Sequence, residues 1–346
     1  MEVDLTTDKT LLDTVILRLS GEIAIKGERT RREFQSILRR NIERTLRREK
    51  ILYDDLILKP GRFYLKVGVD EEVLKVLSRI FGISSFSPAL ETRFYLKDIV
   101  EGSLRVASSA LSEEASFAVR CRRVGSHPYT SETVCREVGK RILETFPNLR
   151  LRVDLENPDV TIGIEIRENS SYIYVKTFEG AGGLPHGTQP KLVGLISGGL
   201  DSPVACWLAM KRGSPIVFLY FDNSPYSDPD ELNTVLKVAK RLLCWTPRSR
   251  GKLYVAKNGE NLRDIIDVSP KGTICILCKR LMYRVACRLA EKVKALGIVT
   301  GEIIGEQASQ TLWNLHVIDS AAEGTPVYRP VIGFDKVEIE RLARKI

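Results

Sequence analysis

The stretch Lys191–Pro203, KLVGLISGGLDSP, decides the fold of the second half of the chain. Its first part, Lys191–Ile196, is almost wholly apolar and predicts a buried strand. A helix is predicted from Pro203 to Met210, so the residues between strand and helix form a glycine-rich loop. Such a loop brings the free N–H groups and the positive dipole end of a helix toward a bound anion.

The loop itself, SGGLDS over residues 197–202, has the residue types that hold phosphate groups. Gly198 and Gly199 let the backbone approach an anion closely, and Ser197 and Ser202 add hydroxyl donors. Pro203 suits the first helical position, where its missing N–H costs nothing. The loop lacks the Gly-Lys-Ser/Thr ending of a Walker A motif. A simple chain reversal at Gly-Gly is the alternative, and the serines on both sides disfavour it.

Strands and helices alternate after this loop. We predict strands over 214–221, 252–256 and 298–300 and helices over 231–243 and 281–296, the last closed by Gly297. Strands that are almost entirely apolar and alternate with helices indicate a doubly wound parallel sheet with both faces covered. Ligands of such sheets bind at the carboxyl ends of the strands.

The first half of the chain predicts smaller α+β units. Helices are expected over 30–50, 71–79, 101–114 and 131–145, and strands over 14–19, 56–59, 62–69, 116–122, 159–167 and 172–178. Thr30 and Glu33 form a capping-box pattern at the start of the first helix. The stretch 179–189, EGAGGLPHGTQ, is rich in Gly and Pro and predicts a tight functional loop or an interdomain linker.

The composition is that of a globular protein with a basic surplus. The 346 residues include 53 Lys+Arg and 44 Asp+Glu, a formal net charge of +9. This surplus suits a polyanionic partner, and a charge-rich surface of a thermophile is the alternative. The length predicts two or three domains. No run of 18 apolar residues predicts a membrane span, and Met1–Asp13 lacks the pattern of a signal peptide, so we expect a cytoplasmic protein.

The positive charge is concentrated near the amino terminus. Residues 26–50 hold ten basic and four acidic side chains, which accounts for two thirds of the surplus. The predicted helix over 30–50 is therefore strongly basic, as an element that binds a nucleic acid would be.

Beyond single motifs, the order of segments along the chain is similar to a known family. SGGLDS resembles the signature of the PP-loop ATP pyrophosphatases. The succession GEIAIKG, RREFQSILRRNI, VGSHPYTSETVCREVG, VDLENPDVTIGIEIR, GAGGLPHGTQP and SGGLDSPVACWLAMKRG looks like the tRNA 4-thiouridine synthetases, the ThiI family. The resemblance covers essentially the whole chain. It implies an α+β ferredoxin-like domain over 1–78, a THUMP RNA-binding domain over 79–180 and an α/β PP-loop domain over 181–346, which could be truncated after Ile346.

The resemblance also implies an activity. ATP is cleaved between its α and β phosphates with Mg²⁺, O4 of a tRNA uridine at position 8 is adenylated, and sulfur displaces AMP. Sulfur would come from a persulfide donor such as a cysteine desulfurase, or from free sulfide, because the chain has no room for a rhodanese-like domain. Relatives suggest a homodimer. The alternatives are a PP-loop enzyme that supplies sulfur for thiamine thiazole synthesis and an RNA-binding protein with a relic nucleotide fold.

The site residues implied by the family fall around the loop. Ser197, Gly198, Gly199 and Ser202 would cradle pyrophosphate, and Asp201 would hold Mg²⁺ or position the loop. The remaining nucleotide contacts are expected at Leu195, Ile196, Tyr220, Phe221, Lys279, Gly301 and Gln310. For Lys279 the alternative is a solvated lysine, and for Tyr220-Phe221 it is the core of the sheet.

Cys275 and Cys278 are the one close pair among seven cysteines. Beside Asp201 and Lys279 they are the expected catalytic residues, because a helix N-terminus lowers a thiol pKa. Three interpretations stay open: iron–sulfur ligands, a sulfur-relay or disulfide pair, and unreactive thiols. Some ThiI relatives, mainly archaeal ones, use a CxxC here to ligate an iron–sulfur cluster, which needs a third protein ligand. Family members often carry a further Cys beyond this chain's end, and Cys287 is a weak substitute.

The RNA-binding residues are expected in two groups, and both would grip folded tRNA by phosphate and shape. They are Lys26, Arg29, Arg31, Arg32 and Arg39 in the basic helix region, and Arg120, Arg122 and Arg123 in the THUMP-like region. The three histidines, His127, His186 and His316, show no metal-ligand spacing.

Overall fold

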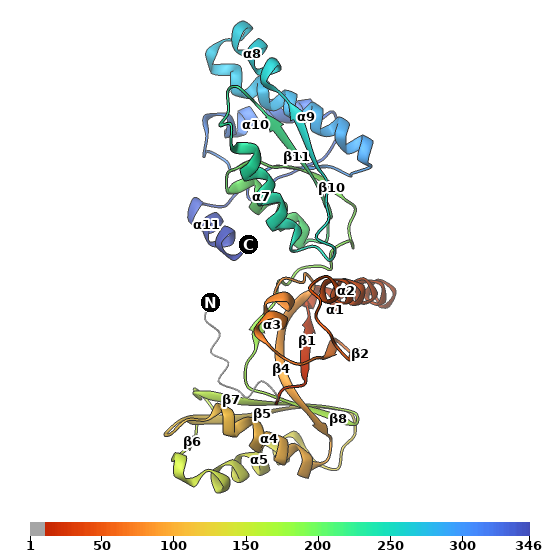
Figure 1. Ribbon diagram of the computed structural model, residues 1–346, viewed down its shortest axis with the longest axis vertical. Coiled ribbons are helices and arrows are strands. Elements are labelled where there is room, and N and C mark those ends of the chain that lie inside the picture. Colours follow the sequence, from red (N-terminus) through yellow and green to blue (C-terminus); the bar gives the residue numbers. More distant parts are fainter. Residues whose placement is uncertain (1–10) are drawn as a thin grey trace. The chain divides into compact units, whose positions relative to one another are not determined.

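The computed structural model describes residues 11–346 (Figure 1). The stretch in which no signal peptide was predicted lies mostly outside the described residues. Internal contacts divide the chain into two compact units, described here separately. The first holds the described residues up to Ala24, Glu49–Arg79 and Ile83–Gly182, and the second holds Ile25–Arg48, Ile80–Gly82 and Gly183–Ile346. No helix in the described residues is long and apolar enough to cross a membrane.

The first unit is built on one sheet of nine strands in the order β2-β3-β1-β4-β8-β7-β5-β6, with β9 beside β4. The strands are β1 Thr14–Leu19, β2 Asp55–Lys59, β3 Arg62–Lys66, β4 Ile83–Arg93, β5 Ser116–Val124, β6 Arg152–Val153, β7 Val160–Arg167, β8 Ser170–Tyr174 and β9 Phe178–Glu179. Four helices belong to this unit: α1 Gly21–Ala24, α3 Glu71–Leu77, α4 Leu96–Ala110 and α5 Ser131–Thr145.

Strand β4 joins the two halves of this sheet and was not predicted. Its first half pairs with β1 and its last four residues, Leu90–Arg93, pair with β8, so one continuous strand serves both halves. Pro88 and several serines give this segment no strand-like alternation, and its burial comes from its partners on both sides.

By its contacts, helix α2, Glu28–Arg48, belongs to the second unit. Asn41 donates from Nδ2 to the His186 carbonyl at 2.9 Å, and the Arg48 guanidinium donates to the Thr246 carbonyl. The helix begins two residues before the predicted start, so the predicted capping box is wrong: Thr30 lies inside the first turn.

The second unit contains the predicted parallel sheet, and the fold class is confirmed. Its five strands run in the order β12-β11-β10-β13-β14, and every pair is parallel. The strands are β10 Leu192–Leu195, β11 Ile216–Asp222, β12 Leu253–Lys257, β13 Ile298–Val299 and β14 Val327–Tyr328. The helices are α6 Asp201–Lys211, α7 Glu231–Leu243, α8 Gly259–Val268, α9 Ile274–Val293, α10 Leu312–Asp319 and α11 Lys336–Lys345. Apolar residues of α9 pack with those of β10, β11 and β13 in one core cluster.

Two helices of the second unit differ from prediction at their ends. Helix α9 begins at Ile274 rather than at residue 281, and this places the CxxC pair and Lys279 inside the helix. It ends at Val293, where the next residue, Lys294, takes the left-handed conformation with φ 55°, so the predicted closure by Gly297 is wrong. Helix α6 begins at Asp201, so Pro203 is its third residue rather than its first.

Candidate nucleotide-binding site

The loop between β10 and α6 is closed by its own serines. The Ser197 N–H donates to Ser202 Oγ at 2.9 Å, and the two hydroxyl oxygens lie 3.0 Å apart. Ser197, Gly198 and Gly199 are exposed, and α6 starts within the loop. The arrangement presents backbone donors and a helix N-terminus at the carboxyl edge of the sheet, which is the geometry that binds a phosphate.

Gly301, the second residue after β13, packs against this loop. A Cβ at Gly301 would lie 2.5 Å from the Ser202 nitrogen and 2.7 Å from both the Asp201 carbonyl carbon and the Ser202 Cα. These neighbours are backbone atoms, which cannot turn aside as a side chain can. The position therefore requires glycine, and the contact sets how closely the two strand ends approach.

A cavity of about 220 Å³ opens at this edge. It brings together nine of the predicted site residues: Leu195, Ile196, Ser197, Asp201, Ser202, Phe221, Lys279, Gly301 and Gln310. Met282, Tyr283, Thr300, Glu302 and Gln307 complete the lining. A larger cavity of about 680 Å³, lined by residues such as Pro190, Leu192 and Phe334, contains none of the predicted residues.

Five predicted residues do not line the smaller cavity. Gly198 and Gly199 stay in the exposed loop, and Cys275 and Cys278 lie earlier on α9. Tyr220 is 3% exposed. Burial and the nearby Glu231 carboxylate raise the pKa of Tyr220 to about 12. Since neighbouring residues of a strand point to opposite faces, Tyr220 faces away from the side where Phe221 meets the cavity.

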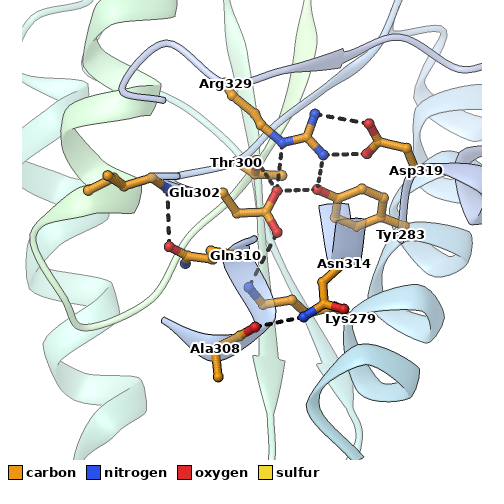
Figure 2. Close-up of polar contacts among 10 residues, drawn as sticks. Lys279, Tyr283, Thr300, Glu302, Ala308, Gln310, Asn314, Asp319 and Arg329 are labelled. Carbon is orange, nitrogen blue, oxygen red and sulfur yellow. Dashed lines mark hydrogen bonds and ion pairs between the residues drawn. The ribbon is translucent and has the colours of Figure 1, made fainter. Parts of the chain in front are cut away.

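A buried polar network forms one wall of the cavity (Figure 2). Lys279 Nζ lies 3.3 Å from Glu302 Oε1, and Thr300 Oγ1 donates to Glu302 Oε2 at 3.1 Å. Arg329 Nε donates to the same Oε2 at 2.8 Å, and Tyr283 OH also donates to it. Burial works to raise the pKa of Glu302, but the Tyr283 hydroxyl and the charges of Lys279 and Arg329 hold it below its usual value.

Gln310 is held on the same edge by the backbone. Its Oε1 accepts from the Ile303 N–H at 3.2 Å, and its carbonyl accepts from the Gly305 N–H at 3.1 Å. Asn314 on α10 donates from Nδ2 to the Ala308 carbonyl at 2.7 Å, which ties the start of that helix to the same segment (Figure 2).

Sequence reasoning missed Lys336, at the start of α11. Its Nζ lies 3.1 Å from Asp201 Oδ1 and 3.2 Å from Glu306 Oε1. Hydrogen bonds to these two carboxylates raise the pKa of Lys336. The Asp335–Glu338 capping box that begins α11 was the only local signal, and it does not point to the loop. An Asp at the rim of a phosphate loop fits Mg²⁺, which is usually held by one or two carboxylates together with phosphate oxygens.

The cysteine pair lies near the start of α9, at its second and fifth residues. Cys275 is exposed, whereas Cys278 is partly buried and its Sγ accepts from Asn258 Nδ2 at 3.9 Å. Burial raises the pKa of the Cys278 thiol, the opposite of the lowering predicted from the helix N-terminus. Among residues 11–346 no group of three or more His, Cys, Asp or Glu side chains could hold a metal. The two thiols alone therefore do not complete an iron–sulfur site, which needs further ligands.

The predicted RNA-binding residues are mostly at the surface. Lys26, Arg29, Arg32 and Arg39 are exposed and Arg31 is partly exposed. Arg32 pairs with Glu28 and Arg39 pairs with Glu43 on α2. On β5, Arg120 and Arg122 are exposed and Arg123 is half-buried. Arg120 donates to the Leu155 carbonyl, and Arg123 donates to the Gly125 carbonyl at 3.1 Å.

Comparisons with known proteins agree with the geometry. Family models match in order along the chain: the ThiI ferredoxin-like domain over 14–87, the THUMP domain over 95–176 and the Thiamine biosynthesis protein (ThiI) over 187–346. The "Probable tRNA sulfurtransferase" of Methanosarcina acetivorans is 38% identical, with 96% of this chain and 81% of the relative covered. That of Methanothermobacter thermautotrophicus is 41% identical, covering 96% and 84%.

Two solved structures resemble the whole chain. One is described as a 4-thiouridine synthetase–RNA complex with bound ATP; it has 33% identity and a TM-score of 0.85, covering 96% of this chain and 84% of that one. The other, PH1313 from Pyrococcus horikoshii, has 28% identity and a TM-score of 0.76, covering 96% and 99%. With its ferredoxin-like, THUMP and PP-loop domains in this order, the chain belongs to the ThiI family of tRNA sulfurtransferases.

Proposed function

We propose that this protein uses ATP to convert a tRNA uridine, the one at position 8, to 4-thiouridine. The observation that carries the proposal is the cavity at the carboxyl edge of the parallel sheet, where nine predicted site residues from separate parts of the chain meet. Curated relatives named tRNA sulfurtransferase support the reaction, and a similar structure described as bound to RNA and ATP supports both ligands.

The reaction has two steps that balance without an added oxidant or reductant when sulfide is the donor. Uridine O4 attacks the α-phosphorus of ATP, pyrophosphate leaves, and the N3 proton is lost. Hydrosulfide then adds at C4, AMP leaves with the former O4, and the proton on sulfur passes to N3, which gives 4-thiouridine. A persulfide donor such as a cysteine desulfurase is the other source of sulfur that we propose, and Cys275 and Cys278 are candidates for relaying it.

The loop residues have a direct role in the first step. Ser197, Gly198, Gly199 and Ser202 would surround the leaving pyrophosphate with backbone and hydroxyl donors. Asp201 would hold Mg²⁺, which supplies charge neutralisation to the phosphates when bound. Lys279 reaches the same cavity from α9 and would add a positive charge to the phosphate side.

The adenosine would occupy the other end of the cavity. Leu195, Ile196 and Phe221 offer apolar contact at the ends of two neighbouring strands. Gly301 and Gln310 close the site from the β13 side, and Tyr220 would support the floor from the opposite face of the sheet.

The basic residues would bind the tRNA. Lys26, Arg29, Arg31, Arg32 and Arg39, with Arg120, Arg122 and Arg123, would contact phosphates rather than read bases. We propose domain bounds of 1–78, 79–180 and 181–346, a homodimer as the working assembly and a cytoplasmic location.

The decisive experiment supplies purified protein, kept anaerobic, with unmodified tRNA, Mg-ATP and sulfide. We expect thiolated uridine and AMP in equal amounts, measured by nucleoside mass spectrometry and nucleotide chromatography. A Lys279→Met variant serves as the matched control and should form both far more slowly, at a low residual rate that can still be measured. ATP turnover without tRNA thiolation would instead favour a role in thiamine synthesis, for which the matching family, Thiamine biosynthesis protein (ThiI), is named. No nucleotide turnover would favour an RNA-binding protein with a relic fold.

A further inference from the structure

The two carboxylate oxygens of Glu302 have different partners. Oε2 accepts from Arg329 Nε at 2.8 Å, from Thr300 Oγ1 at 3.1 Å and from Tyr283 OH. Oε1 accepts from Lys279 Nζ at 3.3 Å. One oxygen is thus saturated by fixed donors, while the other faces the end of a long, flexible side chain (Figure 2).

The fixed side of this carboxylate is secured by a second ion pair. Arg329 pairs with Asp319 through both terminal nitrogens, and its NH2 also donates to Tyr283 OH at 3.0 Å. The side chains of Glu302 and Arg329 are 7% and 10% exposed. Buried charges are tolerated only when they are paired and hydrogen-bonded, and these two meet both conditions.

The contact with Lys279 is of another kind. At 3.3 Å it is longer than the 2.7–2.9 Å typical of a charge-assisted hydrogen bond. The Lys279 side chain is 21% exposed and lines the cavity. If Lys279 turns to another anion, Glu302 loses one partner on Oε1 and keeps three on Oε2.

We propose that Glu302, fixed by Arg329, is a positioning residue that holds the Lys279 ammonium at the cavity wall and releases it to an entering polyphosphate. The inference rests on the proposed function for the identity of that polyphosphate, ATP. Glu302 competes with the phosphates for Lys279, so it lowers ground-state affinity. In return it keeps an otherwise mobile lysine within reach of the reacting phosphates.

Glu302→Gln tests this role, because the amide keeps the shape of the side chain and removes its charge. In the absence of ATP, we expect Lys279 to react several-fold faster with an amine-acylating reagent in the variant, as measured by peptide mass spectrometry against exposed Lys271 as the internal reference. ATP should protect Lys279 in both proteins. By calorimetry the variant should bind ATP as tightly as the unchanged protein or more tightly, while AMP formation falls at least tenfold.

A double-mutant cycle with Lys279→Met shows whether Glu302 acts through Lys279. We expect Glu302→Gln to change AMP formation less than twofold in the Lys279→Met background. An equal fold loss in both backgrounds, or equal acylation rates of Lys279 with and without Glu302, would overturn the proposal. Glu260→Gln, at an exposed glutamate, is the control that should change none of these readouts.

Arg329 is tested by a graded pair. Arg329→Lys keeps one donor for Oε2 and should retain part of the activity, whereas Arg329→Met should lose it. If Arg329→Met unfolds below the assay temperature, Asp319→Asn replaces it, because Asp319 is a hydrogen-bond partner of Arg329 and not of Lys279 or Glu302. This variant should also bind ATP normally while AMP formation falls, by a smaller factor than in Arg329→Met. Loss of ATP affinity in step with rate in these variants would argue for a purely structural role. A wild-type chain that binds ATP and thiolates no tRNA would refute the proposed function alone, since acylation and calorimetry need no RNA.

Discussion

Replacing Gly301 by alanine is expected to displace the phosphate loop. The added Cβ would lie 2.5 Å from the Ser202 nitrogen, and real Cβ contacts below 3.0 Å are essentially never seen. The two backbone segments must therefore separate by about half an ångström, at a site where Ser202 also accepts the hydrogen bond from the Ser197 N–H.

The expected cost follows from the overpacking it creates. Inserting a methyl group into a filled site costs about 1–3 kcal/mol. If the strain is expressed in the ATP-bound geometry, the Kd for ATP rises about 5- to 150-fold, since about 1.4 kcal/mol is tenfold. If it is expressed in folding, the midpoint of thermal unfolding falls by about 2–12 °C, at about 2–4 °C per kcal/mol for a domain of this size.

Calorimetry with Mg-ATP and circular dichroism melting measure both outcomes on the same protein sample. Gly333→Ala is the matched control, because a Cβ there meets nothing within 4 Å and the residue has no strained backbone. A Gly301→Ala protein with unchanged affinity and unchanged melting would refute the close approach of β13 to the loop.

Three further outcomes are expected. Ser202→Ala removes the acceptor of the Ser197 N–H, and we expect ATP binding to weaken by about 0.5–1.5 kcal/mol. Calorimetry should show the Kd for ATP rising about 2- to 13-fold, and an unchanged Kd would contradict the loop geometry. Iodoacetamide at pH 8 should label exposed Cys275 well before Cys206, whose burial raises its pKa to about 12, and equal labelling in a peptide map would count against the fold. The logarithm of tRNA affinity should fall with the logarithm of salt concentration, and Arg29→Ala should flatten that slope by about 1; a slope near zero in the unchanged protein would rule out phosphate contacts.

Local signals in the sequence were sufficient for several elements. Helix α5 has the predicted bounds, Ser131–Thr145, because Thr130 caps it by accepting from the Thr133 N–H. Strand β1 and helix α7 also have the predicted bounds. In each case the hydrophobic period and the flanking residues point to the same structure.

Other elements depended on distant partners. Strand β4 lies between β1 and β8, and its irregular sequence becomes a strand because both neighbours offer unpaired backbone groups. The start of α9 was placed seven residues too late, since the charged and apolar residues after Thr273 gave no clear cap. Lys336 could not be assigned to the site, because it comes 135 residues after the Asp201 that it contacts.

By itself the sequence determined the strand–loop–helix of Lys191–Met210 and hence a phosphate-binding edge, because adjacent glycines, serines and an apolar strand act over a few residues. The tertiary structure decided what surrounds that edge. Parallel pairing of β13 with β14 brings Arg329 to Glu302 across 27 positions, and α9 brings Lys279 and Tyr283 to the same carboxylate. A buried charge needs partners from every side, and only the packing of separate elements can supply them.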